Sequence, residues 1–125
     1  MLLWASSPSR AEEQGTAPAP GMTDYVTCAV YYRMVVGSMS PRHGRDLGPL
    51  ADIARDKMST AIELARSSAA GEFGKEHAEE KFQSAWRATL NDMTDQINRN
   101  YDNITLLRSR YGNRCEQLIK GASRD

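Results

Sequence analysis

Apolar residues recur at steps of three and four along most of the chain, which predicts an all-α protein because such positions share one face of a helix. A first helix is expected from Thr23 or Asp24, either of which can cap it, to about residue 40, where Pro41 stops it. A second helix is expected from Pro49 to about Ala70. A short turn that contains two glycines follows it.

The third apolar pattern is the longest and keeps its phase from about residue 75 to about residue 119. Its apolar positions are Phe82, Trp86, Leu90, Met93, Ile97, Tyr101, Ile104, Leu107, Tyr111, Cys115 and Leu118. An unbroken phase favours one continuous helix. The weak point is the stretch from Asn98 to Asn103, because it is rich in poor helix formers.

Two arrangements of these helices are consistent with the pattern. The favoured one is a three-helix, hairpin-like bundle, in which the first two helices lie end to end along a long C-terminal helix. The alternative breaks the third helix at Asn98–Asn103 and gives an up-down four-helix bundle. Both bring Cys28 close to Cys115. A two-layer hairpin buries little surface, so the favoured arrangement would leave an apolar stripe that needs a partner.

Cys28 and Cys115 are the only cysteines, and we expect them to form one structural disulfide, with two buried free thiols as the alternative. Their spacing is not that of a redox C-x-x-C pair or of a zinc site. Chain-entropy arguments assign about 4–5 kcal/mol to closing so long a loop. That contribution would offset a thin apolar content, since Leu, Ile, Val and Phe together make up only 20 of the 125 residues. Tyrosines near both cysteines predict aromatic packing around the bridge.

The N-terminal residues predict export from the cytoplasm. Residues 1–11 match the remnant of a secretory signal peptide, because a short apolar run precedes Ser9 and Ala11, the small residues required before a cut at Glu12. Residues 12–22 are expected to be a flexible leader, and residues 23–121 a single helical domain. An exported protein would be periplasmic or secreted, where disulfides persist. The alternative is an ordinary N-terminal tail.

Composition and charge argue against several function classes. Sixteen basic and sixteen acidic residues give a net charge of zero, which disfavours a nucleic-acid binder held by bulk charge. No apolar run approaches the length of a membrane span. Phosphate-binding, dinucleotide-binding and zinc-protease motifs are missing from the sequence. We therefore expect no enzymatic activity, no catalytic residue, no cofactor and no metal.

The two histidines stand in contexts that match catalytic or metal-binding motifs only in part. Arg42-His43-Gly44-Arg45 resembles the signature of histidine phosphatases, but the strand, the second histidine and the chain length which that family needs are not visible. His77 and Glu80 share one helix face, whereas di-metal bundles use repeated Glu-x-x-His pairs. We interpret both histidines as solvated residues.

Four residues are expected to contact a partner. Tyr31 lies off the main apolar stripe of its helix, and Arg108, Arg110 and Arg114 form a local basic cluster. These features favour a non-enzymatic exported protein that acts by protein–protein contact or self-association. It would be an accessory subunit of an envelope assembly or an inhibitor-like binder. The alternative is a periplasmic stress chaperone.

Two short segments around the cysteines carry a resemblance. Thr27-Cys28-Ala29-Val30-Tyr31-Tyr32, paired with Arg110-Tyr111-Gly112-Asn113-Arg114-Cys115, resembles small exported two-cysteine helical proteins of proteobacteria. The resemblance implies an export signal, a Cys–Cys bridge and a helical fold. It implies no activity.

Overall fold

The computed structural model describes residues 19–39 and 48–123, and within these ranges the chain is all-helical. The four main helices are α2 (Met22–Ser38), α3 (Gly48–Phe73), α4 (Lys75–Gln96) and α6 (Asn113–Ser123). A 3-10 turn (Tyr101–Asn103), the short helix α5 (Ile104–Leu107) and a π-helical turn (Arg108–Gly112) join α4 to α6. The predicted all-α class is confirmed. The signal-peptide remnant at residues 1–11 and most of the leader at 12–22 lie outside the described residues.

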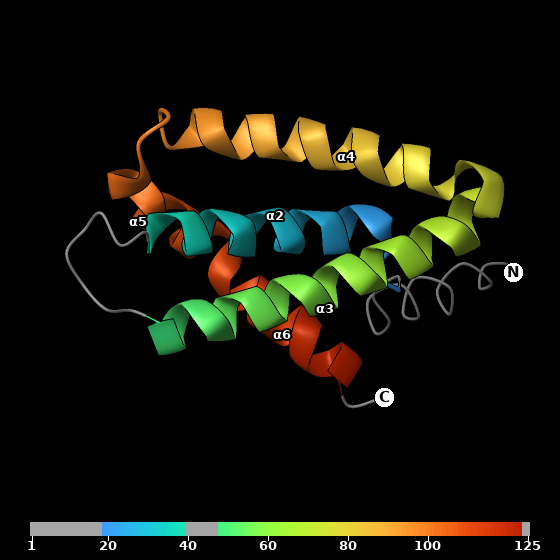
Figure 1. Ribbon diagram of the computed structural model, residues 1–125, viewed down its shortest axis with the longest axis horizontal. Coiled ribbons are helices and arrows are strands. Elements are labelled where there is room, and N and C mark those ends of the chain that lie inside the picture. The colour runs from blue at the N-terminus through green and yellow to red at the C-terminus, as the bar shows by residue number, and fades with distance from the viewer. Residues whose placement is uncertain (1–18, 40–47, 124–125) are drawn as a thin grey trace, which may run out of the picture.

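The central helix of the bundle is α2. Figure 1 shows it between α4 and α3, with the segment from α5 to α6 crossing behind them. It runs antiparallel to α3 and in the same direction as α4. Its buried side chains point to every side of the helix: Met22, Val26, Cys28, Ala29, Val30, Tyr31, Tyr32, Met34 and Val35. A helix that is apolar all round must be covered all round, which explains its central position.

The first two helices are not arranged end to end, as the favoured sequence interpretation expected. They pack side by side, and α2 also contacts α4. The surface that α3 buries is a row of small residues at helical spacing: Ala51, Ala54, Ala61, Ala65 and Ala69. Small side chains let two helices approach closely. The all-round burial of α2 therefore decides the arrangement, because a single neighbour would leave most of its apolar surface in water.

The long third helix is interrupted after Gln96, so the structure has the break of the four-helix alternative. Asn98 and Arg99 both take positive φ angles, of 56° and 58°. The N–H of Asn98 donates to the carbonyl of Asp95 and that of Arg99 to the carbonyl of Thr94, both at 2.9 Å. This pair of bonds is a Schellman motif, which ends a helix with a left-handed residue, usually glycine and sometimes asparagine.

The asparagines that weakened the helical pattern also build the connection. The side chain of Asn103 donates to the carbonyl of Ile97 (2.9 Å), and the side chain of Asn100 accepts from the N–H of Asp102 (3.0 Å). The apolar phase continues across the break because Ile97 is buried and Ile104 also packs against the core. An unbroken phase was therefore not proof of an unbroken helix.

A disulfide between Cys28 and Cys115 joins α2 to α6 across 87 positions of sequence, as predicted. The two Cα atoms lie 5.4 Å apart, and both residues are fully buried. The ring centroid of Tyr31 is 5.1 Å from that of Tyr32 and 6.3 Å from that of Tyr111, which confirms aromatic packing near the bridge. The disulfide is the covalent link between α6 and α2, and the side chains of Glu116 and Arg114 add polar contacts from α6 to α2 and α3.

Replacing both cysteines, as Cys28→Ala with Cys115→Ala, should lower the free energy of unfolding by about 4–5 kcal/mol, because the unfolded chain regains the freedom of the long loop. Urea denaturation of the oxidised protein and the double variant measures this loss. Amide hydrogen exchange should show that α6 loses protection before α2 does. The reduced wild-type protein is the control and should behave like the double variant. Equal urea midpoints for the oxidised protein and the variant would contradict the assignment.

Candidate functional site

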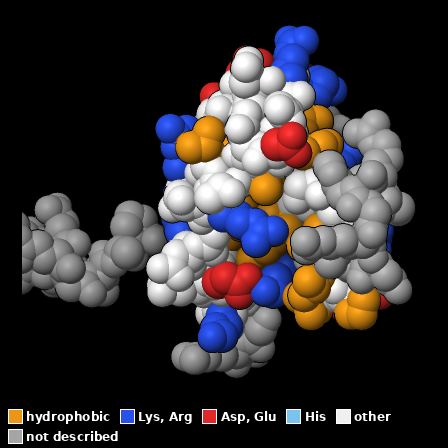
Figure 2. All heavy atoms as spheres, turned by 90° about the vertical axis from the view of Figure 1, so that its left-hand side faces the viewer, with side chains coloured by type: hydrophobic (Ala, Val, Ile, Leu, Met, Phe, Trp, Pro, Cys, Tyr) orange, Lys and Arg blue, Asp and Glu red, His pale blue; other side chains and the backbone are white. Residues whose placement is uncertain are grey.

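A shallow groove lies where the end of α2, the start of α3 and the π-helical turn meet. Its volume is about 200 Å³, and it has an aromatic floor, an apolar edge and a charged rim. It is lined by Tyr31, Tyr32, Val35, Met39, Leu50, Ile53, Ala54, Lys57, Arg108 and Glu116, and we call it the tyrosine groove. Figure 2 views this end of the molecule and shows hydrophobic side chains in a hollow and along the lower edge, where α3 begins.

The edge of the tyrosine groove is formed by Leu50 and Ile53. Their side chains are 52% and 50% exposed, and their i, i+3 spacing puts them on one face of α3. Among the residues that the structure describes, the other exposed large apolar side chains are Leu106 and Phe73. Phe73 lies at the opposite end of the same helix. Two adjacent apolar side chains beside a hollow form an open apolar edge that a partner could cover.

The rim of the groove contains a charge network that links three helices. The hydroxyl of Tyr32 donates to Oε2 of Glu116 (3.2 Å), and Nζ of Lys57 donates to the same oxygen (2.5 Å). The ammonium of Lys57 holds the pKa of the Glu116 carboxyl below its ordinary value. Burial raises the pKa of the Tyr32 phenol, and the neighbouring Glu116 charge raises it further. The network therefore keeps Glu116 ionised and Tyr32 protonated at neutral pH.

Tyr31, expected to be a contact residue on the surface, is instead part of the groove floor. Its side chain is only 6% exposed, and burial raises the pKa of its phenol. A Cβ atom at Gly112 would lie 3.1 Å from the Tyr31 hydroxyl, so the glycine in the π-helical turn makes room for this ring. Tyr31 thus shapes the groove from below, because its side of α2 packs against Tyr111 and Gly112 of the π-helical turn.

The expected basic cluster is divided among three places. Arg108 is exposed at the rim of the tyrosine groove and makes no ion pair with a residue in the described ranges. Arg110 donates to the side chain of Gln96 on α4, and Arg114 pairs with Asp24 on α2. Arg108 and Arg110 are two positions apart and point to opposite sides of the helix. Arg110 and Arg114 are four positions apart, but their side chains reach partners on different helices, Gln96 on α4 and Asp24 on α2. The structure joins only Arg108 with Tyr31.

The sequence pattern did not point to Leu50, Ile53, Lys57 or Glu116 as site residues. The signal that could have found the first two is a pair of parallel stripes on the second helix. One stripe consists of the buried alanines, and the other carries the larger residues one position earlier. No sequence signal could pair Lys57 with Glu116, because they lie 59 positions apart.

The predicted absence of a metal is still a prediction. Within residues 19–39 and 48–123, no group of three His, Cys, Asp or Glu side chains is placed to hold a metal ion. His77 is exposed in the first turn of α4, and His43 lies outside the described residues. No helix in the same ranges has both the length and the apolar character that crossing a membrane requires.

Glu116→Gln should remove a pH-dependent part of the stability. Because the pKa of the folded Glu116 carboxyl is below its ordinary value of 4.5, its contribution is present above that pH. The contribution is lost as the pH falls through the lowered pKa, since the unfolded chain then binds the proton more readily. The difference in melting temperature between the wild type and Glu116→Gln should therefore shrink between about pH 5 and pH 3.

Glu63→Gln, on the exposed side of α3, is the matched control for this measurement. Its melting temperature should differ little from that of the wild type throughout this pH range. A difference for Glu116→Gln that stays constant across the acid range would contradict the lowered pKa.

Comparisons of the chain with models of protein families, with curated proteins and with solved structures find no match. The resemblance to small exported two-cysteine helical proteins therefore stays a prediction.

Proposed function

We propose that this protein is a non-enzymatic exported protein that binds another protein through the tyrosine groove. The observation that carries the proposal is the half-exposed pair Leu50 and Ile53 beside a hollow with an aromatic floor. Apolar surface that becomes buried on contact contributes about 25 cal/mol per Å². Contact energy in protein interfaces concentrates in such apolar pockets with a polar rim. The protein would act as an accessory subunit or an inhibitor-like binder.

The chemistry of the rim indicates what the partner presents. Arg108 is exposed and has no acidic neighbour within ion-pair distance in the described ranges, whereas Lys57 is already paired with Glu116. A partner segment that carries an apolar side chain next to a carboxylate would satisfy both the edge and Arg108. Such charge pairs at a rim orient the partner and speed association more than they add affinity.

Export is the second part of the proposal. The Cys28–Cys115 disulfide supports it, because disulfides persist in oxidising compartments such as the periplasm and the extracellular space. The small residues before Glu12 support it as well.

The binding surface is tested with the double variant Leu50→Glu/Ile53→Glu. Glutamates near the N-terminus of a helix are compatible with its dipole, so α3 should still fold. The tagged wild-type chain should capture one stoichiometric partner from the envelope fraction, and the double variant should lose it. Arg108→Ala should weaken capture about tenfold or less, as expected for a charge at a rim. Tyr31→Ala is unsuitable, because removing a buried ring would leave a cavity.

The matched control is Ser59→Glu/Ser67→Glu, which adds the same two charges to exposed positions elsewhere on α3. It should capture the partner as the wild type does. If Leu50→Glu/Ile53→Glu captured the partner as well as the wild type does, the tyrosine groove would not be the binding surface. Many substoichiometric proteins in place of one would favour the chaperone alternative. A dimer of the wild type that the double variant does not form would identify a second copy as the partner.

Export is tested by the intact mass of the native protein under non-reducing conditions. The expected mass is that of a chain that begins at Glu12 and lacks two hydrogens, because the signal-peptide remnant has been removed and the disulfide has formed. A mass that includes Met1 and two free thiols would contradict export.

A further inference from the structure

A second and larger groove lies at the C-terminal end of α4. It has a volume of about 610 Å³, within the range of small-molecule sites. Met34 of α2, Ile97 and Tyr101 give it an apolar side. Asn91, Thr94, Asp95 and Arg99 give it a polar side. We call it the Arg99 groove, and it shares no lining residue with the tyrosine groove.

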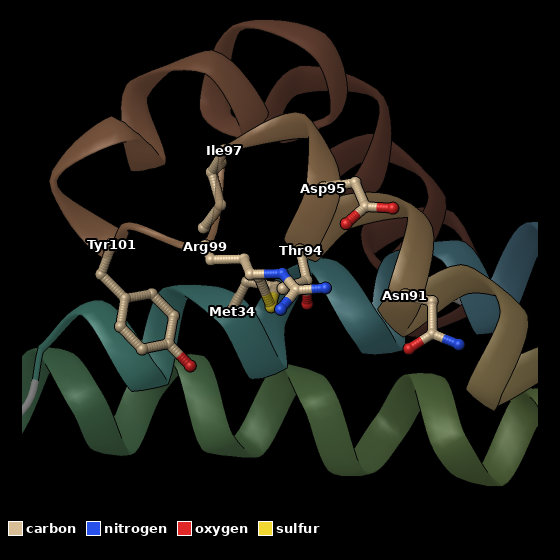
Figure 3. A pocket seen from close by; sticks show the side chains of 7 residues that line it. All are labelled: Met34, Asn91, Thr94, Asp95, Ile97, Arg99 and Tyr101. Atoms are coloured by element: carbon tan, nitrogen blue, oxygen red, sulfur yellow. The ribbon is translucent and has the colours of Figure 1, made fainter.

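Arg99 enters this groove through an unusual backbone conformation. Asn98 already supplies the left-handed residue that the Schellman motif needs, yet Arg99 also has a positive φ of 58°. This conformation is unfavourable for a residue with a Cβ atom, and it is held by the bond from the Arg99 N–H to the Thr94 carbonyl. Figure 3 shows that the side chain extends along the groove between Tyr101 and Asn91.

The guanidinium of Arg99 does not serve to cap the C-terminal end of α4. An arginine beside a helix C-terminus often donates to the last carbonyls. Here four carbonyls of that end already have donors: those of Met93, Thr94, Asp95 and Ile97. The guanidinium of Arg99 makes no hydrogen bond or ion pair with any residue in the part of the chain that the structure describes. Its five N–H groups are therefore available to a ligand.

The other groups of the groove restrict the ligand. Asp95, whose carboxylate likewise has no partner among the described residues, balances the charge of Arg99, which disfavours a phosphate or a dianion. Met34 and Ile97, 2% and 1% exposed, form an apolar base. The ring of Tyr101 is held against α2, because a Cβ atom at Gly37 would lie 2.5 Å from its Cζ. The Tyr101 ring forms a flat wall, and together with the apolar base it lies beside the Arg99 guanidinium. This combination suits a ligand in which a carboxylate is attached to a hydrophobic group.

We propose that the Arg99 groove binds a small ligand in which a carboxylate adjoins an apolar group. The carboxylate accepts hydrogen bonds from the Arg99 guanidinium, which has the planar fork that suits it. The apolar group lies on Met34, Ile97 and Tyr101. A free hydrophobic amino acid and the carboxyl end of a peptide both present this chemistry. They differ in the ammonium of the amino acid, which Asp95 would face.

The test titrates the oxidised full chain with three probes and follows the binding by NMR. L-leucine represents the free amino acid, N-acetyl-L-leucine represents a chain end, and L-leucinamide lacks the carboxylate. We expect the methyl resonance of Met34 to shift with L-leucine or N-acetyl-L-leucine and to respond at least about tenfold more weakly to L-leucinamide. Tighter binding of L-leucine assigns a free amino acid, and equal or tighter binding of N-acetyl-L-leucine assigns a chain end.

The key variant is Arg99→Asn, because asparagine tolerates the left-handed backbone and replaces the guanidinium and most of its methylene stem with a short neutral amide. It should weaken binding of the carboxylate probes by about tenfold to a hundredfold, while the melting temperature stays close to that of the wild type. Arg99→Lys keeps the positive charge but lacks the planar fork of the guanidinium. Its affinity for the carboxylate probes should lie between that of the wild type and that of Arg99→Asn. Arg87→Gln, at an exposed position of α4 outside the groove, is the matched control and should bind as the wild type does.

Three results would overturn the proposal. The first is no response of Met34 to either carboxylate probe up to about 10 mM, a concentration above a weak millimolar dissociation constant. The second is binding of L-leucinamide equal to that of L-leucine. The third is unchanged binding in both Arg99→Asn and Arg99→Lys.

Discussion

The structure depends on covering α2 from every side. Its buried residues are distributed around the whole helix, so no single neighbour can remove them from water. The α3–α4 hairpin covers two sides, and the segment through α5 and the π-helical turn covers a third. The Cys28–Cys115 disulfide then holds α6 to the helix that everything else surrounds. A chain with so few large aliphatic residues gains from a covalent link because the core alone is small.

Both candidate sites lie where this packing ends. Each of the two lies where a helix stops and the chain turns. The tyrosine groove lies between the end of α2, the start of α3 and the π-helical turn. The Arg99 groove lies beside the Schellman turn at the end of α4. Irregular backbone of this kind is where proteins commonly place their binding groups, because the regular elements hold it in position.

The charged side chains fall into two groups, those paired between helices and those that face a groove. Around the tyrosine groove, Glu116 receives both the Tyr32 hydroxyl and the Lys57 ammonium, so one carboxylate connects α2, α3 and α6. Arg108 and Arg99, in contrast, face grooves and have no acidic partner within ion-pair distance in the described ranges. The paired groups tie helices together, whereas the two arginines are the cationic groups on which the proposed binding sites depend.

The helical class and the positions of most helices could be predicted from the sequence because they follow from local spacing, and the two cysteines favoured a disulfide. The sequence also located the weak point at Asn98–Asn103, although the continuous apolar phase favoured a helix through it. The central position of α2, the burial of Tyr31 and the separation of Arg108, Arg110 and Arg114 follow from contacts between helices. The same contacts bring Lys57 to Glu116, 59 positions apart. These outcomes depend on which faces meet in space, and periodicity along one chain specifies a face without specifying its neighbour.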